Sequence, residues 1–247
     1  MALIASICDR RTVTCMSLGV KILSISLTLG LMACSASAPS QPVSSVSSVS
    51  SIPSISKVET IETTAPAVTY ESVTVGSMTY KIGDTGPAGG IIFYAVQEPF
   101  SCGPQLSLMC NFLESALTDS EVKRGWSNDE YEEIAASGAD RTEIGAGYQN
   151  TLDIVKQGST DASLSGAAYA YGYEFGGFTD WFLPSKDEFR EQFTHKDVIG
   201  GFSVADYWSS TELDPNFAWS QFFYSTHPQL LHPKNHYTHY IRPVRAF

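Results

Sequence analysis

Three histidines near the C-terminal end of the sequence have the side chains best suited to bind a metal ion: His232, His236 and His239. Imidazole nitrogen is a common ligand of zinc and copper. In a strand, residues four apart share a face but lie roughly 13 Å apart, which is too far for one ion. A helix would bring them together, but Pro233 and the β-forming Tyr237 disfavour a helix. We therefore expect an exposed polar loop between two strands, with metal binding as the alternative.

The carboxylates around Trp126 are a second group with possible metal chemistry, because calcium prefers oxygen ligands. They are Asp119, Glu121, Asp129, Glu130, Glu132 and Glu133. The sequence contains no Asp-x-Asp-x-Asp-Gly loop, so we expect these acids to form a solvated face. No cofactor is predicted, and calcium is the alternative that these acids leave open.

Tryptophan can stack on a sugar ring, although packing in a core is its commoner role. Of the four tryptophans, Trp126 and Trp219 are candidates for ligand contact, together with the acid Glu212. Ser209 and Ser210 lack the Gly-x-Ser-x-Gly context of an activated nucleophile. The sequence therefore predicts no catalytic residue and no enzyme.

The formal net charge is −11, from 26 acids and 15 bases. Such a balance argues against a nucleic-acid partner, which usually requires a basic patch. Arg242 and Arg245 are the bases of the last predicted strand. We expect them to pair with acids such as Asp180 or Glu212.

The first 34 residues have the pattern of a secretory signal peptide. Their bases precede an apolar stretch, residues 22–33, that is shorter than the roughly 20 residues a membrane-spanning helix needs. Small residues follow, and the segment 31–34 reads LMAC, which resembles the bacterial lipobox. That resemblance implies cleavage after residue 33 and acylation of Cys34. It also implies that outer-membrane lipid is a partner, because Ser35 rather than Asp follows the cysteine.

Residues 34–66 are predicted to be the lipidated cysteine and a flexible tether. They are rich in Ser, Pro, Val and Thr, contain no aromatic residue, and repeat Val-Ser-Ser at 43–51. Such a segment buries too little apolar surface to offset its chain entropy. The r.m.s. span of about 32 such residues is on the order of 30 Å.

Beyond the tether, residues 67–247 are expected to form one domain, with its core at about 80–247. Apart from Cys34, this mature part contains two cysteines, Cys102 and Cys110. Export exposes them to an oxidising compartment, so a disulfide that closes a short loop is predicted. Two zinc ligands are the alternative, but no second ligand pair with suitable spacing occurs.

Short helices and strands are both predicted within the domain. Residues 147–157 and 161–173 suit helices, and the capping box of Ser185 and Glu188 predicts the start of a third. Apolar and β-forming runs predict strands at 91–96, 206–212, 217–224 and 237–247. Residues 67–79 alternate enough for a first strand or continue the linker. Pro243 within the last strand predicts that this strand lies at the edge of a sheet or contains a bulge. The order favours an α+β domain with a mainly antiparallel sheet and two to three short helices.

Several short motifs together resemble one bacterial family. They read IGDTGP (82–87), GGIIFY (89–94), LESA (113–116), IGAG (144–147), NT (150–151), DWFLPS (180–185), YWSSTE (207–212), AWS (218–220) and VRAF (244–247). In order and spacing they resemble the Lcl C-terminal domain family, a domain of unknown function named after a collagen-like bacterial adhesin. The resemblance covers about residues 80–247. It implies a fold akin to C-type lectins and to the formylglycine-generating enzyme, and it implies no catalytic residue set.

The founding member of that family is an adhesin that binds sulfated glycans. This chain lacks its collagen repeats, and an acidic chain suits polysulfated partners poorly. The resemblance therefore suggests a cell-envelope, outer-membrane lipoprotein that presents a lectin-like binding or adhesion domain on a tether. Its partner would be a glycan or an envelope protein. One alternative is an envelope structural or protein-interaction module without a glycan ligand. Another is an accessory or enzyme-like relative of formylglycine-generating proteins.

Overall fold

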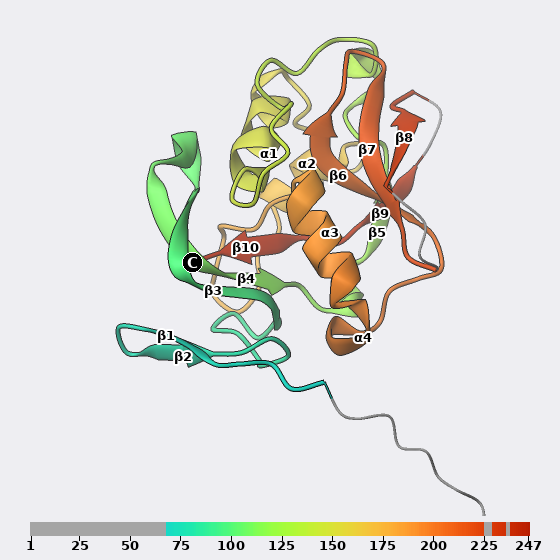
Figure 1. Cartoon of the computed structure of the whole chain (residues 1–247). Coiled ribbons are helices and arrows are strands. Elements are labelled where there is room, and N and C mark those ends of the chain that lie inside the picture. The colour runs from blue at the N-terminus through green and yellow to red at the C-terminus, as the bar shows by residue number, and fades with distance from the viewer. Residues whose placement is uncertain (1–67, 225–228, 236–237) are drawn as a thin grey trace, which may run out of the picture. The chain divides into compact units, whose positions relative to one another are not determined.

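Strands dominate the described part of the chain, and the helices are short (Figure 1). The structure is a computed structural model that describes residues 68–224, 229–235 and 238–247. Most strand pairings there are antiparallel, so the predicted α+β class with a mainly antiparallel sheet is confirmed. Short 3₁₀ helices also occur: η1 (Pro104–Leu106), η2 (Thr118–Ser120) and η3 (Asp129–Tyr131).

The predicted leader (residues 1–33), the lipidation site Cys34 and the tether (residues 34–66) lie outside the described residues. Description begins at residue 68, one residue after the expected start of the domain. Among the described helices, none has the length and apolar character needed to cross a bilayer.

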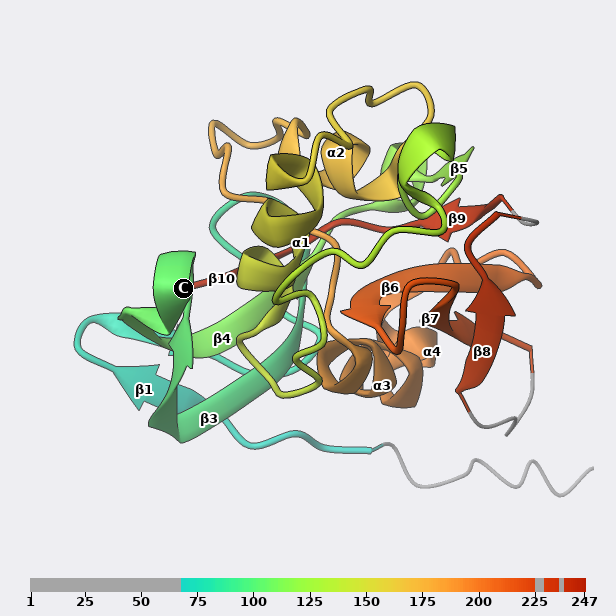
Figure 2. The same cartoon turned by 90° about the horizontal axis from the view of Figure 1, so that it is seen from above.

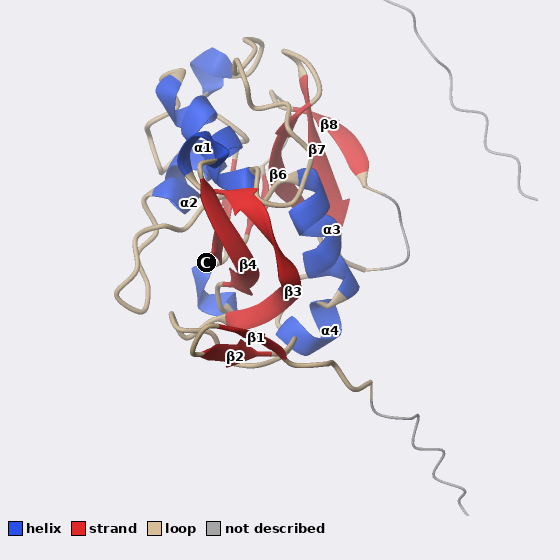
Figure 3. Cartoon of the chain, turned by 60° about the vertical axis from the view of Figure 1, so that its left-hand side comes forward, coloured by secondary structure: helices blue, strands red, loops and turns tan. Residues whose placement is uncertain are grey.

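The domain begins with a small hairpin, as the alternation of residues 67–79 suggests. Its strands are β1 (Val73–Val75) and β2 (Met78–Tyr80), and they turn at Gly76, whose φ is +60°. This conformation suits glycine, which has no Cβ to clash. The Gln97 side chain donates to the Thr74 carbonyl at 3.2 Å, which fastens the small hairpin to the larger sheet beside it (Figure 3).

A long hairpin and the C-terminal strand form the first sheet, in the order β10–β4–β3. Its strands are β3 (Ile91–Cys102), β4 (Leu108–Ser115) and β10 (Val244–Ala246). The sequence predicts the start of β3 but misses β4. Residues 110–115 of β4 are all buried, so polar and apolar positions do not alternate and the usual strand pattern is absent.

The second sheet has five strands in the order β5–β9–β6–β7–β8. They are β5 (Val122–Arg124), β6 (Asp206–Glu212), β7 (Phe217–Phe222), β8 (Leu230–Pro233) and β9 (His239–Ile241). The predicted strands at 206–212 and 217–224 are confirmed as β6 and β7. The parallel pairing of β6 with β9 puts a late strand in the middle of the sheet.

The predicted single strand at 237–247 is wrong, because the chain changes sheets within it. β9 belongs to the five-stranded sheet and β10 to the three-stranded one. Pro243 lies at the break, where it has no amide hydrogen to offer either ladder. Its carbonyl accepts a hydrogen bond from the amide of Ala116 at 2.9 Å. The C-terminal segment therefore connects the two sheets covalently.

One face of the five-stranded sheet packs against α1 (Gly147–Lys156) and α2 (Gly166–Tyr171) (Figure 2). Trp126 and Trp208 are fully buried there among small and aliphatic residues. The helix predicted at 147–157 is confirmed. The one predicted at 161–173 is confirmed in its second half, where Ala-rich turns approach the sheet closely.

The opposite face packs against α3 (Lys186–Thr194), which α4 (Lys196–Ile199) follows. Phe189 of α3 meets Tyr207 of β6 in an aromatic cluster. Tyr207 and Trp208 are consecutive, so they point to opposite faces of the strand. The predicted capping box starts α3 as expected: the Ser185 hydroxyl accepts from the Glu188 amide, and the Glu188 carboxylate accepts from the Ser185 amide.

Candidate functional site

Two of the three predicted ligand contacts, Trp126 and Glu212, come together inside the protein. Trp126 is fully buried, and its indole nitrogen donates to the Ser209 carbonyl at 2.9 Å. The ammonium of Lys234 lies 4.6 Å from the centroid of the Trp126 ring. It donates to Glu212 at 2.8 Å and to the Ile134 carbonyl at 3.2 Å. The ring face that a sugar would need is therefore occupied by a cation of the chain itself.

Glu212 is a structural acid in this arrangement. Burial raises the pKa of its carboxyl, and the ion pair with Lys234 opposes that rise. The backbone amide of Ala136 also donates to Glu212, at 2.9 Å to one oxygen and 3.2 Å to the other. Its oxygens therefore face partners within the fold rather than a ligand.

Trp219, the third predicted contact, is half-buried in β7. The ammonium of Lys186 lies 3.5 Å from its ring centroid, which is a close cation–π contact. Opposite it in the sheet is Leu231, which is partly exposed. The indole keeps exposed surface, but one of its faces is covered by the lysine.

Two of the three candidate metal-binding histidines lie on strands and meet. His232 belongs to β8 and His239 to β9, and the latter is buried, so the expectation of an exposed loop is wrong for both. Nε2 of His239 lies 3.0 Å from Nδ1 of His232. The Ser220 hydroxyl lies 2.8 Å from the same Nδ1. His236 lies outside the described residues.

Burial, and next the neighbouring His232, lower the pKa of His239 to about 3. A neutral His239 with its proton on Nε2 can donate to Nδ1 of His232, and that nitrogen has a single lone pair, so the Ser220 hydroxyl competes with His239 for it. In the described ranges, no group of three or more His, Cys, Asp or Glu side chains is placed to hold a metal ion.

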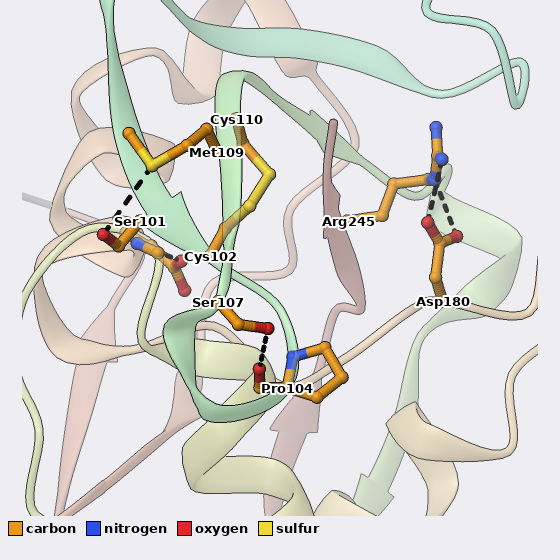
Figure 4. Close-up of a disulfide and its surroundings, with 10 residues drawn as sticks. Ser101, Cys102, Pro104, Ser107, Met109, Cys110, Asp180 and Arg245 are labelled. Carbon is orange, nitrogen blue, oxygen red and sulfur yellow. Dashed lines mark hydrogen bonds and ion pairs between the residues drawn. A yellow bond between two sulfur atoms is a disulfide. The ribbon is translucent and has the colours of Figure 1, made fainter.

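The predicted disulfide between Cys102 and Cys110 is present, with its Cα atoms 6.0 Å apart (Figure 4). Both cysteines are buried. The bond closes the tip of the β3–β4 hairpin, where Gln105 and Leu106 both have positive φ, an uncommon conformation for residues other than glycine. The Gln105 amide donates to the Gln149 side chain of α1 at 2.6 Å. The bond thus holds a strained loop against the helix.

A small apolar hollow of about 110 Å³ lies beside this disulfide. Its walls include both cysteines, Tyr148, Phe182 and Asp180. Two apolar residues of the neighbouring strand, Leu108 and Met109, are exposed by 56% and 61%.

The predicted pair of Arg245 with Asp180 is confirmed, with two contacts of 2.9 Å (Figure 4). The same guanidinium also donates to the buried Glu114 at 3.2 Å. Glu114 accepts backbone amides from the glycine-rich turn as well, including that of Gly90 at 2.6 Å. A Cβ atom on Gly90 would collide with the Ser115 carbonyl, so this turn needs glycine in order to close around the carboxylate.

Arg242 pairs with Glu121 rather than with either acid suggested by the sequence. Its Nη2 and Nε lie 2.6 and 3.0 Å from Glu121 Oε1. The Tyr207 hydroxyl donates to the same oxygen at 2.5 Å. Burial and this carboxylate raise the pKa of Tyr207. One acid of the predicted solvated face is therefore part of a buried network.

Glu188 is a fully buried acid without an ion pair among the described residues. Burial raises the pKa of its carboxyl to about 7, and hydrogen bonds to backbone amides oppose the rise. Gly145 donates at 2.8 Å and Ser185 at 2.7 Å. A carboxyl with this pKa could serve as a general acid, but burial keeps it from any ligand, so we assign it to capping α3.

An open polar hollow of about 250 Å³ remains at the β5 end of the five-stranded sheet. Its lining combines both signs of charge with amide and hydroxyl groups and one apolar side chain: Lys123, Arg124, Gly125, Asp129, Glu132, Ser163, Leu164, Asn235 and Thr238. Sequence reasoning found Asp129 and Glu132 as acids but missed the rest. The adjacent bases Lys123 and Arg124 inside an acidic stretch were the available signal.

The cations of this hollow are held in place by neighbouring groups. Arg124 donates to the carbonyls of Ala162 at 2.8 Å and of Lys123 at 2.7 Å. Its guanidinium lies 5.7 Å from the Tyr169 ring centroid, and the Lys123 ammonium lies 4.7 Å from that of Tyr240. Neither cation forms an ion pair with a carboxylate of the described residues.

No protein-family model matches this chain, and no curated protein matches it.

Proposed function

We propose that this chain is a lipid-anchored protein of the cell envelope whose domain binds a polar ligand. The observation that carries the proposal is the open hollow at β5, because it offers charged, amide and hydroxyl groups together at the surface. Binding sites typically combine a concave surface with a few convergent polar groups. We call the lining residues given above the polar hollow.

The contacts of the buried titratable side chains favour a binding function over a catalytic one. Glu114, Glu121 and Glu212 are engaged by cations, and Glu188 caps a helix. His239 contacts a second imidazole. A catalytic group must reach its substrate, and these side chains are buried. The two cysteines of the described domain are joined in a disulfide, so neither supplies a thiol.

We also propose that the domain has a lectin-like fold. It is supported by the C-terminal strand β10, which returns to pair with the early hairpin strand β4, and by the second sheet inserted between them in sequence. The motifs that resemble the Lcl C-terminal domain favour the same fold. Glycans of the cell envelope or of a host are then the first ligand class to examine.

A glycan array tests this function. A soluble chain that spans residues 35–247 is labelled and applied to bacterial and host glycans, including peptidoglycan fragments. We expect saturable binding to a restricted set of them. Absence of binding to every glycan would reject the proposed ligand class.

A protein-interaction module is the second candidate, and the hairpin tip favours it. Leu108 and Met109 are exposed apolar residues beside the 110 Å³ hollow, and apolar patches of this kind often contact proteins. Replacing both with serine separates the candidates. Loss of an envelope-protein contact with unchanged glycan binding would favour the second.

A further inference from the structure

We propose that the polar hollow recognises a zwitterionic end group, one that carries an ammonium and a carboxylate. This inference rests on the proposed binding function and narrows its ligand. Free amino acids and the ends of short peptides share this chemistry.

The balance of charge in the polar hollow is the first argument. Lys123 and Arg124 contribute two positive charges, and Asp129 and Glu132 contribute two negative charges. The hollow is therefore formally neutral, whereas the whole chain has a net charge of −11. Two cations gathered at one site of an acidic protein indicate a function for positive charge there.

The second argument compares ligand classes by the charges that each would leave unpaired. An anion would approach Asp129 as well as the cations, and a cation would approach Lys123 and Arg124. A sugar without charged groups would displace water from both signs without supplying a counter-charge, whereas a glycan that carries an ammonium and a carboxylate would supply both. A zwitterion supplies one partner to each sign.

Arg124 is prepared to receive a carboxylate. Its Nε and Nη1 are bound to the carbonyls of Ala162 and Lys123, which fixes the guanidinium plane. Within the described residues, Nη2 makes no hydrogen bond, so its donors remain for a ligand. Arginine recognises carboxylate in a planar geometry, and fixing it in advance lowers the entropic cost of binding.

Asp129 supplies the complementary charge. It is exposed at the start of η3 and forms no ion pair with the described residues. An ammonium that reaches Asp129 while its carboxylate reaches Arg124 would be held at both ends. Leu164, exposed by 43%, also lines the hollow and offers a contact for an apolar side chain of the ligand.

The size of the polar hollow limits the ligand. Its volume of about 250 Å³ is below the range of about 300–1,000 Å³ that is usual for drug-sized ligands. It therefore suits an amino acid or the end of a peptide rather than an extended chain.

Calorimetric titration of the full-length chain in detergent tests the inference. The probes are alanine, alanyl-alanine, N-acetyl-alanyl-alanine, alanyl-alanine amide and N-acetylglucosamine. We expect at least one of the two zwitterions to bind, and each blocked dipeptide to bind at least tenfold more weakly than the zwitterion that binds best. If alanine binds best, the natural ligand is a free amino acid. If alanyl-alanine binds best, the natural ligand is the end of a peptide. Both outcomes support the proposal. Equal binding of the blocked dipeptides, or absence of binding by both zwitterions, would overturn it.

Matched variants place the binding in the polar hollow. Arg124→Gln and Asp129→Asn should each weaken zwitterion binding at least tenfold. Arg190→Gln and Glu98→Gln, which change exposed residues outside the polar hollow, should leave it unchanged. Thermal melting of each variant checks the fold. Wild-type affinity in both hollow variants would reject the assignment. A positive glycan array without zwitterion binding would reject this inference while the proposed function stands.

Discussion

Lys234 and Glu212 form a buried ion pair. Each charge offsets the free-energy cost of burying the other. Glu212→Ala would leave the Lys234 ammonium buried without a carboxylate partner. We expect it to lower the free energy of unfolding by about 3–5 kcal/mol, measured by urea denaturation. The control is Lys186→Met, which removes the partly exposed contact with Trp219 and should cost less than about 1 kcal/mol. Equal losses in the two variants would contradict the structural role of Glu212.

Glu188 should make stability fall as pH rises toward neutrality. Its folded pKa of about 7 exceeds the ordinary value of 4.5, so between these values only the folded chain holds the proton. From pH 5 to pH 7, wild type should lose about 2 kcal/mol relative to Glu188→Gln, which does not titrate. Chemical denaturation at several pH values measures the difference. A constant difference across this range would mean that the carboxyl is ionised throughout.

His239 should have the opposite effect. Its pKa is about 3 in the folded chain and ordinarily 6.5, so between these values the unfolded chain binds the extra proton. Stability contributed by His239 is therefore complete above about pH 6.5 and is lost as pH falls. Melting curves of wild type and His239→Asn should show wild type losing more stability from pH 7 to pH 5. A parallel decline of both would contradict a neutral His239.

Residue contacts were predictable where chemistry restricts the partner. The two cysteines within residues 67–247 have few alternative partners, and Arg245 pairs with Asp180 as predicted. The approach of His232 to His239 was not predictable, because it depends on how two strands converge in space. The burial of Trp126 under Lys234 likewise depends on tertiary packing.

At the scale of secondary-structure elements, the disulfide should stabilise the tip of the β3–β4 hairpin, and removing it tests this role. The cross-link closes a short loop, and the loop-entropy estimate for it is about 2.5 kcal/mol. The double variant Cys102→Ser with Cys110→Ser should melt about 5–10 °C lower than wild type. Hydrogen exchange should increase at the hairpin tip, while pairing at the Ile91–Ser115 end of the hairpin is retained. An unchanged melting temperature would show that the remaining contacts hold the tip.

Elements were predictable where a local signal exists. The capping box fixed the start of α3, and β-forming runs gave β6 and β7. β4 was missed because both of its faces are buried for most of its length. The change of sheets between β9 and β10 was not predictable, since Pro243 marks an interruption but not its direction.

For the whole molecule, the proposed function requires that the domain be attached to a membrane. Several acyl chains on Cys34 would suffice for stable anchoring, where one chain is marginal. Cys34→Ala should abolish incorporation of labelled palmitate and move the chain from the membrane to the soluble fraction. Retention in the membrane without label would contradict the lipid anchor.

The net charge of the whole chain predicts one property of the protein and hides another. The net charge of −11 argues against nucleic acid, but it conceals the pair of cations in the polar hollow. Only the fold brings residues 123–125, 129, 132, 163–164, 235 and 238 around one concavity.

The glycan array repeated with paired variants tests the binding function most directly. Wild type, Arg124→Gln and Arg190→Gln are compared at equal concentration on the same glycans and peptidoglycan fragments. We predict that Arg124→Gln loses at least nine-tenths of the wild-type signal and that Arg190→Gln retains it. Equal signals from all three proteins would contradict binding through the polar hollow, and no signal from wild type would contradict glycans as the ligand class.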